Sequence, residues 1–138
     1  MTTRLFFSTM VLVLLSSCTS KTIDSNVTAT HDSIKKYLDL AGNDSLNTKL
    51  RNKYNDMAFS LVDLSKNDTL TRYYLSSISF KYLKTNNLTS FKKIEKIHFE
   101  KSATAKDTHN LARYYRHKAS YFYIKCIYDS SFIYFIKA

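Results

Sequence analysis

Histidine and carboxylate side chains are the groups in this chain whose types could do chemistry, and their spacing limits what that chemistry is. His109 and His117 are eight positions apart, which on a helix puts them on one side but about 12 Å from each other. That distance is too long for two ligands of one metal ion. His31 and His98 have no partner at a ligand spacing. We therefore predict no metal site.

Two carboxylate pairs have the residue types for general acid–base catalysis. They are Asp63 with Asp68, and Glu95 with Glu100. Each pair has lysines close by in the sequence, namely Lys66, Lys92, Lys96 and Lys101. Carboxylates and lysines at three- or four-residue spacing are typical of a solvated helix face. We therefore expect solvated ion pairs here, and no catalytic residue.

A single glycine in 138 residues excludes glycine-rich phosphate loops and dinucleotide-binding fingerprints, so no cofactor of those classes is expected. Cys126 lies beside Ile124 and Ile127, and we predict that it is a small packed hydrophobic residue rather than a nucleophile. An enzyme with an unrecognised site has no constellation of residues in its favour. The sequence predicts a protein that is not an enzyme.

The segment from Met1 to Ser17 has the pattern of an export signal. Arg4 is followed by an apolar run from Leu5 to Leu15, too short to span a bilayer as a stable helix. The run ends in Leu15-Ser16-Ser17-Cys18, which resembles a bacterial lipobox. That resemblance implies removal of residues 1–17, lipidation of Cys18 and a membrane-anchored lipoprotein on the periplasmic face or the cell surface. An ordinary signal peptide or an uncleaved anchor is the alternative.

The elements that follow are predicted to be helices. Residues 18–30 are polar without apolar periodicity and predict a disordered tether. A short helix is expected after His31, ending at Gly42-Asn43, and a helix of about five turns from Asn47, entered through Asp44 or Ser45. Further helices are expected between the polar turns at Asn67-Asp68, Asn86-Asn87, Lys106-Asp107 and Cys126–Asp129. The chain has no proline and no bounded strand-like alternation, so the predicted class is all-α.

Apolar spacing also predicts which residues pack in the core. They are Ile34, Tyr37, Leu38 and Ala41; Leu50, Tyr54, Met57, Ala58, Leu61 and Leu64; Tyr74, Leu75, Ile78 and Tyr82; Phe91, Ile94, Ile97 and His98; Leu111, Tyr115, Ala119 and Phe122.

The second half of the chain repeats itself. A shift of 41 (113 − 72) places Arg72-Tyr73-Tyr74 on Arg113-Tyr114-Tyr115, and nine of the 26 positions from Arg113 to Ala138 are identical to their counterparts. Self-similarity at a fixed period of this size is typical of helical repeat proteins. We expect copies at about 72–106 and 113–138, and a degenerate unit at about 44–66.

The last copy resembles a tetratricopeptide (TPR) repeat. The large, small and turn positions of that repeat correspond to Tyr115, Ala119, Phe122, Tyr128, Asp129, Ser131, Phe135 and Ala138. Lys118, Cys126 and the long period depart from the family pattern, and the earlier copy matches less well. The resemblance implies antiparallel helix pairs stacked as a short right-handed solenoid over residues 31–138, with a concave surface on the first helix of each pair.

The function implied by this resemblance is non-enzymatic binding of a protein or peptide. Arrays of this kind behind an export signal are similar to the extracytoplasmic input regions of bacterial sensor kinases and regulators. The candidate partner-binding residues on the first helices are Arg72, Ser76, Ser79, Arg113, Arg116, Lys118 and Ser120.

The net charge of +10 permits a different function. A basic cytoplasmic helical domain that binds nucleic acid or an anionic membrane surface is the alternative, and it requires residues 1–17 to be retained. Because an exported protein does not normally meet nucleic acid, we expect none as a partner. Without a polar capping helix, Phe122, Phe132, Phe135 and Ile136 would form a bare apolar end. We therefore expect self-association through the last helix, or that the chain is part of a longer array.

Overall fold

The computed structural model describes residues 22–138, with side chains from residue 28, and throughout this part of the chain every regular element is a helix. The all-α prediction is confirmed for these residues. The predicted signal segment and Cys18 lie outside them. The chain divides into two units, residues 1–32 and 33–138, and the packing described below is that of residues 33–138.

The first described helix, α2 (Thr22–Gly42), begins earlier than predicted. The prediction of a disordered tether up to residue 30 is wrong for residues 22–30, which are helical. Once Ile34 and Leu38 hold the second half of a helix in the core, extending it by further residues costs little. Gly42 is the last residue of α2, and its φ is not positive. In the turn that follows, Asn43 Oδ1 accepts a hydrogen bond from the backbone N–H of Ser45 at 2.9 Å.

Five helices follow: α3 (Thr48–Ser60), α4 (Thr69–Lys84), α5 (Leu88–Thr104), α6 (Thr108–Ile124) and α7 (Tyr128–Ile136). Polar side chains cap four of them at the N-terminus, and these caps are Asn47, Asp68, Asn87 and Asp107. Each accepts a hydrogen bond from the backbone N–H three positions later, which satisfies one of the free donors of the first turn. The predicted entry to α3 through Asp44 or Ser45 is therefore wrong.

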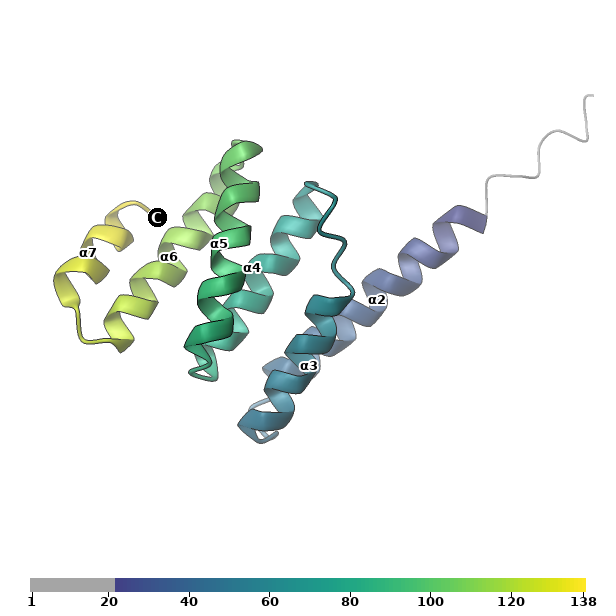
Figure 1. The fold of residues 1–138 in the computed structure, drawn as a ribbon, viewed down its shortest axis with the longest axis horizontal. Helices are drawn as coiled ribbons and strands as arrows, with labels where there is room; N and C mark the ends of the chain where they lie inside the picture. The colour runs from purple at the N-terminus through teal and green to yellow at the C-terminus, as the bar shows by residue number, and fades with distance from the viewer. Residues whose placement is uncertain (1–21) are drawn as a thin grey trace, which may run out of the picture. The chain divides into compact units, whose positions relative to one another are not determined.

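The three connections after α4, α5 and α6 have the same turn. Asn86, Lys106 and Cys126 each have a φ between 53° and 58°, and they recur at an equal spacing along the chain. In each turn the next residue donates its N–H to the carbonyl five positions back, as Asn87 does to Tyr82 at 2.9 Å. This is the Schellman arrangement, built without glycine. Because the turns are alike, successive helices reverse direction in the same way (Figure 1).

The turn spacing corrects the period predicted from sequence identities. The turns at Asn86 and Cys126 are 40 positions apart (126 − 86), and the N-caps Asp68 and Asp107 are 39 apart (107 − 68), whereas the sequence identities gave 41. A shift of 40 pairs Ser79 with Ala119, and both are fully buried. A shift of 41 instead pairs buried Phe91 with Phe132, which is 67% exposed. The identities therefore do not mark equivalent positions, because the turn geometry, rather than the aromatic residues, sets the register.

The apolar core is centred on α4, which contacts α3, α5 and α6. Nine of the 22 residues predicted for the core lie in this apolar cluster: Ile34, Leu38, Ala58, Tyr74, Leu75, Ile78, Tyr82, Phe91 and Ile94. Ala41, His98 and Ala119 are buried as well, whereas Leu61 is exposed, against its prediction. Leu64 is exposed because α3 ends at Ser60, short of the predicted five turns. Buried Asn55 ties α3 to α4 through a hydrogen bond from its Nδ2 to the carbonyl of Ile78 at 2.9 Å.

The last helix, α7, packs on α6 and is apolar on its other side. Phe132, Phe135 and Ile136 are half or more exposed. Phe122 is partly covered because it stacks on Tyr134 at 5.3 Å between ring centroids. Ser131 is buried and donates from its Oγ to the carbonyl of Ala119 at 2.9 Å, which fixes α7 on α6.

Candidate functional site

Three of the seven candidate partner-binding residues are buried and cannot contact a partner. Arg72 is 6% exposed, and its guanidinium donates to Asp107 Oδ2 at 2.8 Å, to Thr69 Oγ1 at 3.1 Å and to the carbonyl of Asn67. It therefore links the start of α4 to the start of α6. Hydrogen bonds from Asn110, followed by those from Arg72, hold the pKa of Asp107 at about 2, so this carboxylate is charged at neutral pH.

Ser76 and Ser79 are also buried, so their prediction as groove residues is wrong. Ser79 Oγ donates to the carbonyl of Ser76 at 3.0 Å and lies 3.2 Å from His117 Nδ1. Both serines lie on the side of α4 that is packed in the interior. Polar residue type alone indicated exposure, whereas a small hydroxyl that bonds its own helix fits a close helix contact.

The four candidates on α6 reach the surface to different degrees. Arg116 is exposed, and Arg113 is partly exposed with its guanidinium 5.1 Å from the centroid of the Tyr73 ring. Ser120 Oγ donates to the carbonyl of Arg116 at 3.0 Å, so it lies along the same side of α6.

Lys118 lies on another side of α6. Its Nζ is 5.9 Å from the ring centroid of Tyr114 and 6.0 Å from that of Tyr121. Tyr121 in turn stacks on Phe91 of α5 at 5.5 Å. Lys118 therefore belongs to the seam between α5 and α6 and is separate from Arg113 and Arg116.

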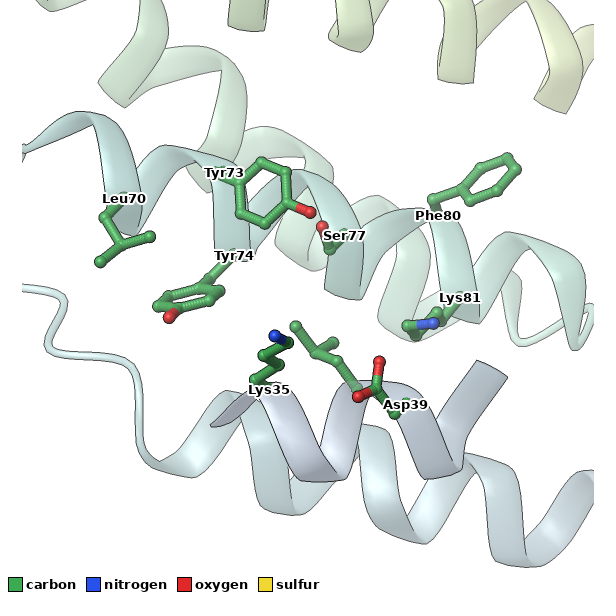
Figure 2. A pocket seen from close by; sticks show the side chains of 9 residues that line it. Lys35, Asp39, Leu70, Tyr73, Tyr74, Ser77, Phe80 and Lys81 are labelled. Carbon is green, nitrogen blue, oxygen red and sulfur yellow. The ribbon is translucent and has the colours of Figure 1, made fainter. Parts of the chain in front are cut away.

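A pocket that the sequence did not predict lies between α2 and α4. Its volume is about 420 Å³, and it is lined by Lys35, Leu38, Asp39, Leu70, Tyr73, Tyr74, Ser77, Phe80 and Lys81. Figure 2 shows Lys35 and Asp39 reaching from α2 toward α4. On α4 the lining residues recur every three or four positions, which places them along one side of the helix. That spacing was visible in the sequence, but the part played by α2 was not.

The exposed part of this pocket is aromatic. Tyr73 and Phe80 are 44% and 41% exposed, and Leu70 is 40% exposed. Large apolar side chains that stay exposed side by side are typical of binding surfaces. Two cations lie over the rings, Arg113 over Tyr73 and Lys84 over Phe80 at 5.8 Å. The aromatic surface of α4 is therefore bordered by positive charge.

Lys81 closes one end of the pocket. Its Nζ lies so close to Gly42 that a Cβ added there would be 2.6 Å away. Burial lowers the pKa of Lys81, and the nearby Asp39 carboxylate opposes that shift. In Figure 2 the Asp39 carboxyl is turned toward Lys81. The pocket thus combines an aromatic surface, a partly desolvated ammonium and one carboxylate.

A second polar feature lies beneath the pocket, in the interior between α4, α5 and α6. We name it the buried polar cluster, and it consists of Ser79, Glu95, His98, Ser102, Asn110 and His117. Glu95 is 1% exposed, so its prediction as a solvated partner of lysine is wrong. Its Oε2 lies 3.7 Å from His117 Nδ1. His117 stacks on Phe80 at 5.1 Å, which connects the cluster to the pocket.

The buried polar cluster brings together two histidines that the sequence left apart. The ring centroids of His98 and His117 are 6.5 Å apart, although the two side chains come from different helices, α5 and α6. Burial, followed by the charge of His117, lowers the pKa of His98 to about 4, so this imidazole is neutral at physiological pH. The cluster is closed to solvent, and no group of three potential metal ligands suited to hold an ion occurs in the described part of the chain.

Cys126 is exposed in its turn, which corrects its prediction as a packed residue. It lies in the turn between α6 and α7, outside both helices. Within residues 22–138 no helix is long and apolar enough to cross a membrane.

No protein-family model, curated protein or solved structure matches this chain.

Proposed function

We propose that this protein is a non-enzymatic scaffold that binds a protein or peptide segment on the surface shared by α2, α4 and α6. The observation that carries the proposal is the open, aromatic pocket between α2 and α4, continued onto α6 by the contact of Arg113 with Tyr73. Pockets with apolar walls and a few polar groups are the usual sites of ligand recognition.

The arrangement of helices supports a TPR-like solenoid as the basis of this surface. In such an array the first helices of successive pairs lie side by side and line a concave face. Here those helices are α2, α4 and α6, and α4 contacts both: α2 through the pocket and α6 directly. The matching turns at equal spacing are what a repeat predicts. The period set by these turns is longer than that of the TPR family.

Export and lipidation at Cys18 belong to the same proposal, with the scaffold acting as a sensory input or adaptor region at a membrane. Labelled palmitate should enter the wild-type protein and the Cys126→Ala variant, and should not enter Cys18→Ala. Cys126 is the matched control because it is an exposed thiol elsewhere in the chain. Equal labelling of all three proteins would contradict lipidation at Cys18.

Binding at the pocket is tested by photo-crosslinking in the cells that make the protein. A benzoylphenylalanine in place of Ser77 lies in the pocket, and one in place of Lys93 lies on the exposed side of α5. We expect a discrete adduct from position 77 that is absent from position 93. The same adducts from both positions, or none from position 77, would refute the scaffold surface.

A further inference from the structure

The surface around the pocket has a charge pattern of its own. We name it the basic face. It consists of Lys35 and Lys81 in the pocket lining, Lys84 over Phe80, Arg113 over Tyr73, and exposed Arg116, which follows Arg113 by about one turn of α6. Only Asp39 brings a negative charge to the pocket lining. The five cations come from three helices, so the fold rather than a local run of lysines brings them together.

None of these cations forms a close ion pair among the described residues, unlike other cations of the chain. Lys66 pairs with Asp63 at 3.9 Å, Lys96 with Glu100 at 3.9 Å, and Arg51 with Asp44 at 2.9 Å. Within residues 28–138 no carboxylate forms an ion pair with a cationic nitrogen of the basic face. The positive charge of this face is therefore only partly compensated, and Asp39 is the one carboxylate in the lining of the pocket.

The geometry of the cations suits a ligand that is both acidic and apolar. Arg113 and Lys84 lie over the rings of Tyr73 and Phe80, so each cation and its ring are presented together. A carboxylate can bind the cation from the solvent side, while an apolar side chain enters the pocket between α2 and α4. Lys81 is half-buried, and a cation that has already lost part of its water gains more from an ionic partner than an exposed one does.

We propose that the basic face binds an acidic peptide segment that carries at least one large apolar side chain, with carboxylates at Lys84, Arg113 and Arg116 and the apolar side chain in the pocket. This inference rests on the proposed scaffold function and names the chemistry of its partner. A nucleic acid would satisfy the cations, but its phosphate backbone has no apolar group to fill a pocket of about 420 Å³ whose lining includes exposed aromatic rings.

The test uses the full chain and three fluorescein-labelled 12-residue peptides. The first alternates glutamate with leucine and phenylalanine, the second has lysine in place of every glutamate, and the third has serine in place of every apolar residue. We expect the first to bind, with affinity that falls at least about tenfold between 20 and 500 mM NaCl. The second and third should bind at least about tenfold more weakly at low salt.

Variants locate the binding. The double variant Lys84→Glu with Arg116→Glu reverses two exposed charges of the basic face and should weaken the first peptide at least about tenfold. The matched control, Lys53→Glu with Lys93→Glu, makes the same charge change at exposed positions of α3 and α5, and should leave affinity within about twofold. Ser77→Trp should fill the pocket and abolish binding without altering charge.

The outcomes separate this inference from the scaffold function. If the lysine peptide or a DNA oligonucleotide binds as tightly as the first peptide and Ser77→Trp abolishes that binding, the scaffold surface stands and the acidic partner is wrong. Equal weakening by the basic-face variant and its control also overturns the acidic partner. If no peptide binds while position 77 crosslinks in cells, the acidic inference alone fails. If neither occurs, both fail.

Discussion

His98 should make the stability of this protein depend on pH between about 4 and 6.5. The imidazole is 0% exposed, and neither ring nitrogen has a hydrogen-bond partner of good geometry within the described residues. Glu95, Asp107, Arg113 and His117 are the charged or titratable groups around it. Burial, then the charge of His117, lowers its pKa to about 4, so folding keeps this side chain neutral where an unfolded chain would protonate it.

The sign and size of the effect follow from proton linkage. An unfolded histidine takes up its proton as the pH falls below about 6.5, whereas folded His98 does so only near pH 4. Between those values the unfolded state binds more protons, so the free energy of unfolding decreases by about 1.4 kcal/mol for each pH unit lost. From pH 6.5 to pH 4.5 the contribution of His98 should fall by about 2 to 3 kcal/mol, and above pH 6.5 it is fully present.

Urea denaturation of the full chain at pH 7.0, 6.0, 5.0 and 4.5 measures this contribution. His98→Gln removes the titrating group and should flatten the pH dependence by about 2 kcal/mol over that range. His109→Gln is the control, because it makes the same substitution at an exposed histidine at the start of α6.

Proton NMR titration of the His98 ring supplies a second measurement if His98→Gln does not fold. The ring should stay neutral down to pH 5. A His98→Gln variant with the wild-type slope, or a His98 ring that titrates near pH 6.5, would refute the reasoning.

Four further predictions concern the helix contacts. Asp107→Ala should lower the free energy of unfolding by about 2 to 4 kcal/mol in urea denaturation, because it removes an N-cap and leaves Arg72 without its ionic partner in the interior. Asp68→Ala removes only a cap and should lower it by about 1 kcal/mol. Equal losses would mean that the ion pair adds no stability. Ala119→Leu should overpack a fully buried contact between α6 and α7 and cost about 1 to 3 kcal/mol, and a neutral result would show that this contact is loose. Lys106→Gly should raise the thermal midpoint, because glycine adopts the positive φ after α5 without steric strain and should add about 0.5 to 1 kcal/mol of stability. A lower midpoint would contradict the positive φ at this turn. Phe132→Lys should reduce any concentration-dependent association seen by light scattering, because it puts a charge on the exposed side of α7; association that is unchanged would place the contact elsewhere.

The helices were predictable because their boundaries have local causes. The turn at Asn86, and the caps at Asp68 and Asp107, are marked by residue types that favour those geometries. The core of α4 was equally clear from its apolar spacing. The start of α2 was not predicted, because residues 22–30 have no apolar pattern and are helical only as an extension of a packed segment.

The interior polar residues were placed wrongly because residue type was taken as a guide to exposure. Arg72 and Glu95 are long, charged side chains of types that are almost never fully buried without a partner, and their partners Asp107 and His117 are remote in sequence. One signal was available. Glu95, His98 and Ser102 recur at three- and four-residue spacing on α5, which predicts a polar stripe on one side of that helix. The direction in which the stripe faces could be learned only from the packing.

The pocket could not be predicted from local sequence patterns, for a similar reason. Its lining on α4 follows helical spacing, but Lys35 and Asp39 come from α2, which is separated from α4 in the chain by the whole of α3. The predicted solenoid placed the first helices of each pair on one face, yet it did not specify which residues of α4 face outward. That depends on the rotation of α4 about its axis, which is fixed by the burial of Leu75 and Ile78.

The most direct test of the proposed binding surface is a map of amide chemical-shift changes in the full chain as the acidic, apolar 12-residue peptide is added. We expect the largest changes at Leu70, Tyr73, Ser77 and Phe80 on α4, with smaller changes at Arg113 on α6, and none on the exposed side of α5. Changes confined to α5 or α7, or saturable binding that leaves α4 unperturbed, would contradict the assignment of the α2, α4 and α6 surface as the site where a partner binds.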